Sequence, residues 1–158
     1  EFNALLSCLD QMKDANVTLV LGLNNSIEMD LLEACLSRKI KVILVLPCGI
    51  LKMKLNEKIK TLWDESFVTI ISLQSPASSW NKFSSARTIR FRLNISKKLL
   101  INTMNESSLR YYLAELRGCQ NFYVNYWSNS VPFFDSIGAK PVGRSRETGM
   151  PMVDALVM

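Results

Sequence analysis

Two uninterrupted apolar runs frame the most regular stretch of this sequence. They cover residues 17–21 and 42–46, and the segment between them repeats apolar residues at helical spacing, at Ile27, Leu31 and Leu32. Strands that are buried on both faces of a parallel sheet need no alternation of polar and apolar residues. The pattern therefore predicts a β-strand, an α-helix and a second β-strand parallel to the first.

Strand and helix patterns continue to alternate along the rest of the chain. Helical periodicity covers residues 2–12, 54–63, 84–93 (capped by Ser84 or Ser85), 106–117 (ended by Gly118) and 132–137. Strand patterns cover residues 67–73, 99–101 and 122–124. This order predicts an α/β fold with an open, mostly parallel sheet and helices on both faces. We expect one domain over residues 1–142 and a loosely attached tail over residues 143–158.

The composition narrows the chemistry that this chain can perform. Its 158 residues include no histidine, which removes histidine-dependent catalysis and most transition-metal sites. The 4 cysteines are scattered without a C-x-x-C pair, which favours free thiols in a reducing cytoplasm. No stretch reaches the roughly 18 consecutive apolar residues of a membrane helix, and no signal-peptide pattern is present. We therefore expect a cytoplasmic protein that contacts no membrane, binds no cofactor and is not an enzyme.

Charge is distributed unevenly along the chain. Residues 1–36 carry six acidic residues and one lysine, residues 37–60 carry seven basic residues and one glutamate, and residues 66–105 carry six basic residues and no acid. A basic band of this kind is typical of a face that binds a polyanion. Solvated lysines on helix surfaces are the simpler interpretation for four of these residues, Lys52, Lys54, Lys58 and Lys60.

Five motifs, in order, resemble those of the Smf/DprA family (DNA-processing protein A). Their family forms are SGLARGID, V-L-G-x-G, NFPRRNRIIAGLS, SGxLITAxxAxxxGRxVFAVPG and N-x-LIxxGAxxV. The corresponding segments here are residues 21–28, 44–50, 82–94, 107–125 and 131–142. The resemblance implies a Rossmann-like domain that binds single-stranded DNA, protects incoming strands during transformation, helps to load RecA and associates with further copies of itself.

This sequence departs from the family motifs at several positions. Asn25 and Ser26 replace the arginine and glycine of ARGID, Ser85 and Ala86 replace the paired arginines, and the residues at 91–92 replace an Ala-Gly pair. The family's strand with its G-S-R turn is not found ahead of residue 2, so we expect a divergent or truncated member.

Basic residues of the third motif are candidates for contacts with DNA. Arg87, Arg90 and Asn94 are spaced to share one helix face, with Lys82 before them and Lys97 and Lys98 after them. These residues can contact phosphates, and Trp80 or Phe83 can stack on a base. In the rival interpretation the arginines are ordinary surface residues and the two aromatic residues belong to the core.

A phosphate or nucleotide site is the second candidate. Gly22, Asn24, Asn25 and Ser26 follow the first predicted strand, with Ser26 as the expected helix cap, and Ser107 and Ser108 begin a later helix. Two such helix starts can hold a phosphate, which would suit a nucleotide-sensing protein. The alternative is that Gly22 and Ser26 only form a tight connection. No Walker A, dinucleotide or phosphoribohydrolase signature is present, and a degenerate protein-interaction module remains a third possibility.

Overall fold

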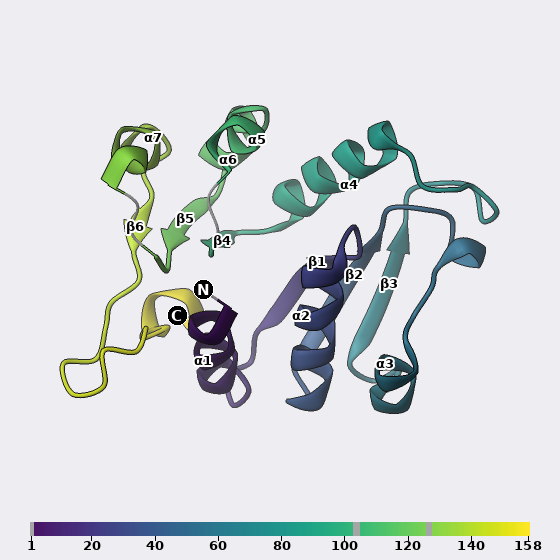
Figure 1. Ribbon diagram of the computed structural model, residues 1–158, viewed down its shortest axis with the longest axis horizontal. Coiled ribbons are helices and arrows are strands. Elements are labelled where there is room, and N and C mark those ends of the chain that lie inside the picture. The colour runs from purple at the N-terminus through teal and green to yellow at the C-terminus, as the bar shows by residue number, and fades with distance from the viewer. Residues whose placement is uncertain (1, 103–104, 126–127) are drawn as a thin grey trace. The chain divides into compact units, whose positions relative to one another are not determined.

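A computed structural model describes residues 2–102, 105–125 and 128–158 of the chain (Figure 1). The chain separates into two compact units, each built on its own β-sheet. The first unit is Asn16–Arg92, and the second consists of Glu1–Ala15 and Leu93–Met158. This division differs from the single domain that we expected over residues 1–142.

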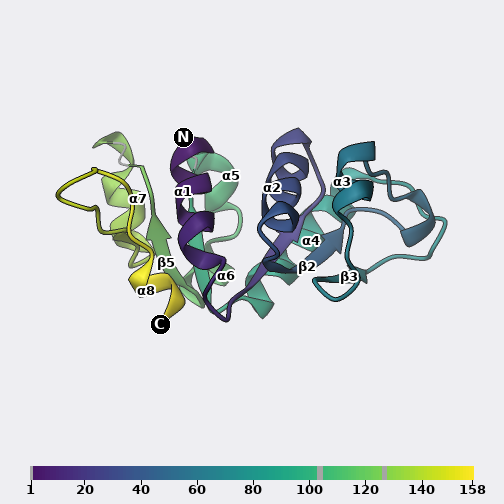
Figure 2. The same cartoon turned by 90° about the horizontal axis from the view of Figure 1, so that it is seen from below.

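The first unit contains a three-stranded parallel sheet in the order β1-β2-β3. Its elements are β1 (Thr18–Gly22), α2 (Ser26–Ser37), β2 (Lys41–Leu46), a 3-10 helix (Ile50–Lys52), α3 (Glu57–Leu62), β3 (Val68–Ser72) and most of α4 (Lys82–Ile95). Helices α2 and α3 lie side by side along one face of this sheet (Figures 1 and 2). The predicted strand–helix–strand unit is confirmed.

The central strand β2 explains why its sequence is apolar without alternation. It pairs with β1 on one edge and with β3 on the other, so both of its faces are covered. Leu44, Val45 and Leu46 are fully buried. Leu32 and Cys35 of α2 are also fully buried, which confirms the predicted apolar side of this helix.

Helix α4 begins at the carboxyl ends of the strands of the first unit. The Asn81 side chain accepts a hydrogen bond from the backbone N–H of Ser84 (2.8 Å), and the Ser84 hydroxyl accepts one from the Asn81 backbone (3.0 Å). This reciprocal pair makes Asn81 the helix cap, so the prediction that Ser84 or Ser85 caps the helix is wrong. Ser84 is buried in the first turn, where its hydroxyl also donates to the carbonyl of Pro47 (2.9 Å).

The second unit holds another three-stranded parallel sheet, in the order β4-β5-β6. Its elements are α1 (Phe2–Met12), β4 (Lys98–Ile101), α5 (Glu106–Arg110), α6 (Leu113–Arg117), β5 (Gln120–Tyr123), a 3-10 helix (Ser128–Ser130), α7 (Val131–Ser136), β6 (Lys140–Pro141) and α8 (Asp154–Val157). Phe133 and Phe134 are almost fully buried, and the ring of Phe134 stacks on Tyr123 with centroids 4.5 Å apart.

Two segments of the second unit differ from the expectation. The helix predicted over residues 106–117 is interrupted at Tyr111 and Tyr112, whose rings meet edge to face, because Tyr112 is buried in a non-helical backbone conformation. The segment 143–158 contacts α1: the Gln11 side chain donates to the carbonyl of Pro151 (2.6 Å) and accepts from the backbone of Val153 (3.2 Å). This tail is therefore held more closely than the predicted loose attachment.

The observed architecture confirms the predicted fold class. Both units are α/β, all strand pairs within the two sheets are parallel, and helices flank the sheets. None of the helices in the described part of the chain is long and apolar enough to cross a membrane.

Candidate nucleic-acid interface

The turn after β1 is where the sequence predicts a phosphate site. Asn25 is the N-cap of α2, and its side chain accepts a hydrogen bond from the backbone N–H of Glu28 (2.9 Å). Ser26, the expected cap, is the first residue of the helix and is exposed. The expectation is wrong because the preceding asparagine already holds the extended N-cap conformation, with φ −151° and ψ 175°.

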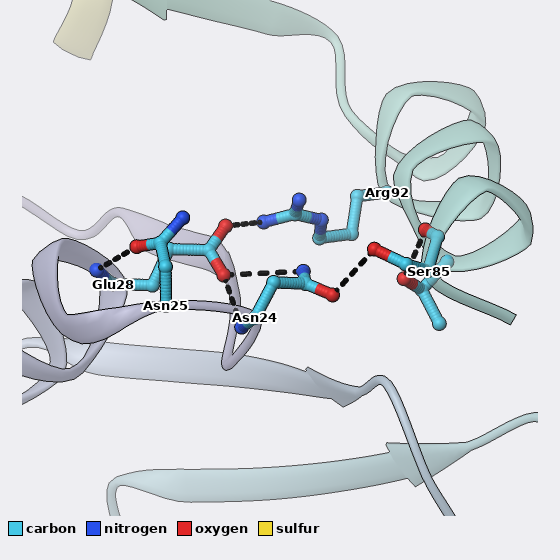
Figure 3. Close-up of polar contacts among 6 residues, drawn as sticks. Asn24, Asn25, Glu28, Ser85 and Arg92 are labelled. Carbon is cyan, nitrogen blue, oxygen red and sulfur yellow. Dashed lines mark hydrogen bonds and ion pairs between the residues drawn. The ribbon is translucent and has the colours of Figure 1, made fainter. Parts of the chain in front are cut away.

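The carboxylate of Glu28 lies inside this turn (Figure 3). Its Oε2 accepts hydrogen bonds from the backbone N–H of Asn24 (2.5 Å) and from the Asn24 side chain (3.1 Å). Its Oε1 pairs with Nη1 of Arg92 at 2.8 Å, and both side chains of this ion pair are 19% exposed. Helix N-termini and unpaired backbone N–H groups attract anions. Here α2 supplies that anion from its own first turn.

Gly22 leaves room for the ion pair. A Cβ atom at this position would lie 2.5 Å from Nη1 of Arg92 and 2.9 Å from Oε1 of Glu28. The Ser85 hydroxyl adds a hydrogen bond to Oδ1 of Asn24 (2.8 Å), which ties α4 to the same turn (Figure 3). The structure thus brings Gly22, Asn24 and Asn25 together around a carboxylate, in the place where the sequence predicts a phosphate.

The segment after β2 is built differently from the turn after β1. The backbone N–H groups of Gly49 and Leu51 donate to the carbonyls of Ser78 (2.8 Å) and Pro76 (2.9 Å), which lie in the loop before α4. A 3-10 turn and an extended residue, Met53, then lead to α3. The loop before α4 is therefore fastened to the end of β2 by backbone hydrogen bonds.

An open cleft of about 930 Å³ lies at these strand ends, within the first unit. Its walls come from residues 23–26 and 29–30, from 47–48, from 52–56 with residue 55 omitted, and from 79–80. The carboxyl ends of parallel strands are the usual ligand-binding edge of an α/β sheet. The cleft therefore occupies the position in which a ligand of this unit would be expected.

Four lysines that the sequence presents as equivalent fall into two pairs. Lys58 forms an ion pair with Glu33, which raises the pKa of its ammonium group, and Lys60 forms one with Glu57 (2.6 Å). Lys52 and Lys54 are exposed and line the cleft. Within the described ranges they have no ion-pair partner. Interpreting all four as solvated helix residues missed this difference. The position of Lys52 and Lys54 ahead of the α3 N-cap was a sequence signal that distinguishes them.

The start of α4 carries exposed cations and exposed aromatic rings. Lys82 and Arg87 are exposed and form no ion pair with any residue that the structure describes. Phe83 is 88% exposed and Trp80 is 56% exposed, so the interpretation that buries both rings in the core is wrong. Arg90 is half-buried on the same helix. The predicted association of basic and aromatic side chains is therefore present at the start of this helix.

The remaining predicted site residues belong to the second unit. Asn94 and Lys97 are exposed, whereas the ammonium group of Lys98 donates to the carbonyls of Ala155 (2.9 Å) and Leu156 (3.4 Å). Lys98 is thus engaged with α8.

Ser107 and Ser108 both interact with Asn105, the N-cap of α5. The Ser107 hydroxyl donates to Oδ1 of Asn105 (2.9 Å), and the same oxygen accepts the backbone N–H of Ser108 (3.3 Å). Both serines are exposed. Their described hydrogen bonds complete the start of a five-residue helix.

The cysteine thiols are poor nucleophiles in this fold. Burial raises the pKa of Cys8 to about 11 and that of Cys35 to about 12, and it also raises the pKa of Cys48 and Cys119. A thiol with such a pKa is protonated at neutral pH and does not attack a substrate. Within the described residues, no group of three or more cysteine, aspartate or glutamate side chains is arranged to hold a metal ion.

Fold and strand order together define the class of protein: an α/β chain with Rossmann-like parallel sheets. No protein-family model and no curated protein matches the sequence. Among solved structures, the fold is similar to that of DNA processing protein A (DprA) from Streptococcus pneumoniae, with a TM-score of 0.63 and 20% sequence identity. The match covers 90% of this chain and 54% of that protein, so the chain spans about half of its length. The likeness supports a DprA-like fold.

Proposed function

We propose that this chain is a non-enzymatic protein that binds single-stranded DNA through the start of α4. The observation that carries the proposal is the pair of exposed rings, Trp80 and Phe83, beside the exposed and unpaired Lys82 and Arg87 among the described residues. Exposed large apolar side chains next to cations are typical of surfaces that stack bases and hold phosphates.

The chemistry of this surface suits a flexible, unpaired strand. Every base offers a π-face to an aromatic ring, so stacking tolerates any sequence, and lysine and arginine bind the phosphates that link the bases. A duplex keeps its bases stacked inside, where Trp80 and Phe83 would not reach them. We therefore infer little sequence preference and a preference for single strands.

The similarity of the fold to DNA processing protein A supports the same proposal. From the family resemblance we extend it to DNA uptake during transformation, to the loading of RecA and to association between copies of the chain. These steps are tested by co-precipitation with RecA and by light scattering. The cleft favours a second candidate, a nucleotide-sensing protein, because its volume of about 930 Å³ at the strand ends is sufficient for a mononucleotide.

A titration with a fluorescently labelled oligothymidylate of about 16 nucleotides tests the main proposal. We expect micromolar or tighter binding that weakens about 50-fold between about 50 and about 200 mM salt, if roughly four phosphates are contacted. Replacing Lys82 and Arg87 together by alanine should weaken binding, whereas replacing Lys58 and Lys60, which removes the same charge, should not. The oligonucleotide should leave the incubation with its mass unchanged, as expected of a non-enzymatic protein.

Two outcomes would contradict the proposal. One is a wild-type chain that does not bind the oligonucleotide even at about 50 mM salt. The other is an equal loss of affinity in the α4 variant and in the Lys58/Lys60 control, which would indicate a general charge effect. Thermal stabilisation by a mononucleotide without binding to the oligonucleotide would favour the nucleotide-sensing function.

A further inference from the structure

We propose that the strand continues from α4 into the cleft, where Lys52 and Lys54 contact its phosphates and Trp80 stacks on a base. This inference rests on the proposed function and specifies the path of the same ligand. Trp80 connects the two areas because it lines the cleft and lies two residues before Lys82 at the start of α4.

The charge of the cleft fits a phosphate chain. Lys52 and Lys54 are the basic residues of its lining, and Asp30 is the acidic one. Asp30 acts electrostatically on Lys58, whose pKa it helps to raise. Lys52 and Lys54 have no ion pair among the described residues, so their ammonium groups are available to an anion.

The turn after β1 explains why the phosphates would lie on the lysine side. Glu28 already accepts the hydrogen bonds that the backbone and side chain of Asn24 would offer to an anion, and its charge is matched by Arg92. A phosphate at that position would have to displace a carboxylate that is paired and 19% exposed. Within this cleft, Lys52 and Lys54 offer the anion an uncontested partner.

The salt dependence of binding tests this assignment directly. For single strands, the slope of log K against log salt concentration falls by about 0.7 for each phosphate contact that is lost. The variant Lys52→Ala with Lys54→Ala should therefore reduce the slope by about 1.4 and weaken binding roughly tenfold at low salt. The matched control, Lys58→Ala with Lys60→Ala, removes the same charge from ion-paired positions and should keep the wild-type slope.

Tryptophan fluorescence provides an independent measurement of stacking. Binding of the oligothymidylate should quench the emission, and Trp80→Leu should remove most of that quenching. Trp63→Phe, a change away from the cleft, should retain it. Circular dichroism of each variant establishes that it is folded, which exposed positions such as Lys52 and Lys54 should allow.

The outcomes separate this inference from the proposed function. If wild type binds and the Lys82/Arg87 variant is weakened, but the Lys52/Lys54 variant behaves like its control, the cleft assignment is overturned and the proposed function stands. If wild type does not bind at all, the proposed function fails and this inference fails with it. A reduced slope in the Lys52/Lys54 variant, together with quenching that depends on Trp80, would support the assignment.

Discussion

The ends of β1 and β2 are neighbours in one sheet, yet their charged groups have opposite arrangements. At the end of β1, a carboxylate and a guanidinium group satisfy each other beneath α4, over a glycine that leaves them room. At the end of β2, Lys52 and Lys54 point into an open cleft with no ion pair among the described residues. The first arrangement stabilises the fold, whereas the second leaves charge available for a ligand.

This contrast shows that basic residues in one band of sequence have different roles. Arg92 holds two elements of the first unit together, Lys60 makes an exposed pair with a neighbour on its own helix, and Lys52 and Lys54 remain available. Burial decides between these roles, because a charge that is removed from water needs a partner and an exposed charge does not.

Breaking the ion pair at the end of β1 should have the largest effect on stability. Arg92→Met leaves the Glu28 carboxylate largely buried without its partner, so the free energy of unfolding should fall by about 3 kcal/mol. Urea denaturation measures this change. The control Lys60→Met breaks a pair whose side chains are 54% and 89% exposed, and it should cost less than about 0.5 kcal/mol. Equal losses in the two variants would remove the distinction between the two kinds of pair.

Gly22→Ala should have the next largest effect. The added Cβ would lie 2.5 Å from Nη1 of Arg92, so the ion pair must shift, and we expect a loss of about 2 kcal/mol. The same denaturation experiment applies. In the background of Arg92→Ala the obstructing guanidinium group is absent, so Gly22→Ala should then cost much less. An undiminished cost in that background would show that the backbone, rather than the ion pair, requires glycine.

Removing the two helix caps should have the smallest effect, and it sharpens the comparison because each strand end has one. Asn25 caps α2 and Asn56 caps α3, each through one hydrogen bond to a backbone N–H, of 2.9 and 2.8 Å. Asn25→Ala and Asn56→Ala should each cost about 1 kcal/mol of unfolding free energy, and aspartate at either position should retain most of it. A much larger loss for Asn25→Ala would mean that the cap also positions Glu28.

Much of the fold was readable from local patterns. The runs at 17–21 and 42–46 predicted β1 and β2 because a strand that is covered on both faces is apolar throughout. The interruption of the helix at Tyr112 was not predicted, since no glycine or proline marks it and the buried ring is placed by tertiary packing. The cap of α4 was placed too late, because Asn81, Ser84 and Ser85 are all suitable caps and only their hydrogen bonds distinguish them.

The candidate site was less readable than the fold. The sequence placed Lys82, Trp80 and Phe83 correctly at the start of a helix, but it did not distinguish exposed rings from core rings, since both are apolar. It also grouped Lys52 with Lys58, because the ion pair of Lys58 with Glu33 joins two different helices. Exposure and pairing at these positions depend on neighbours that are distant in sequence.

The sequence by itself determined the succession of strands and helices, because apolar periodicity follows from which side of an element is buried. Tertiary structure alone decided which charges are paired. Glu28 and Arg92 are 64 positions apart, and no local pattern relates them. Their pairing depends on the position of α4 at the end of β1, and Coulombic attraction between side chains acts on distance in space rather than on separation along the chain.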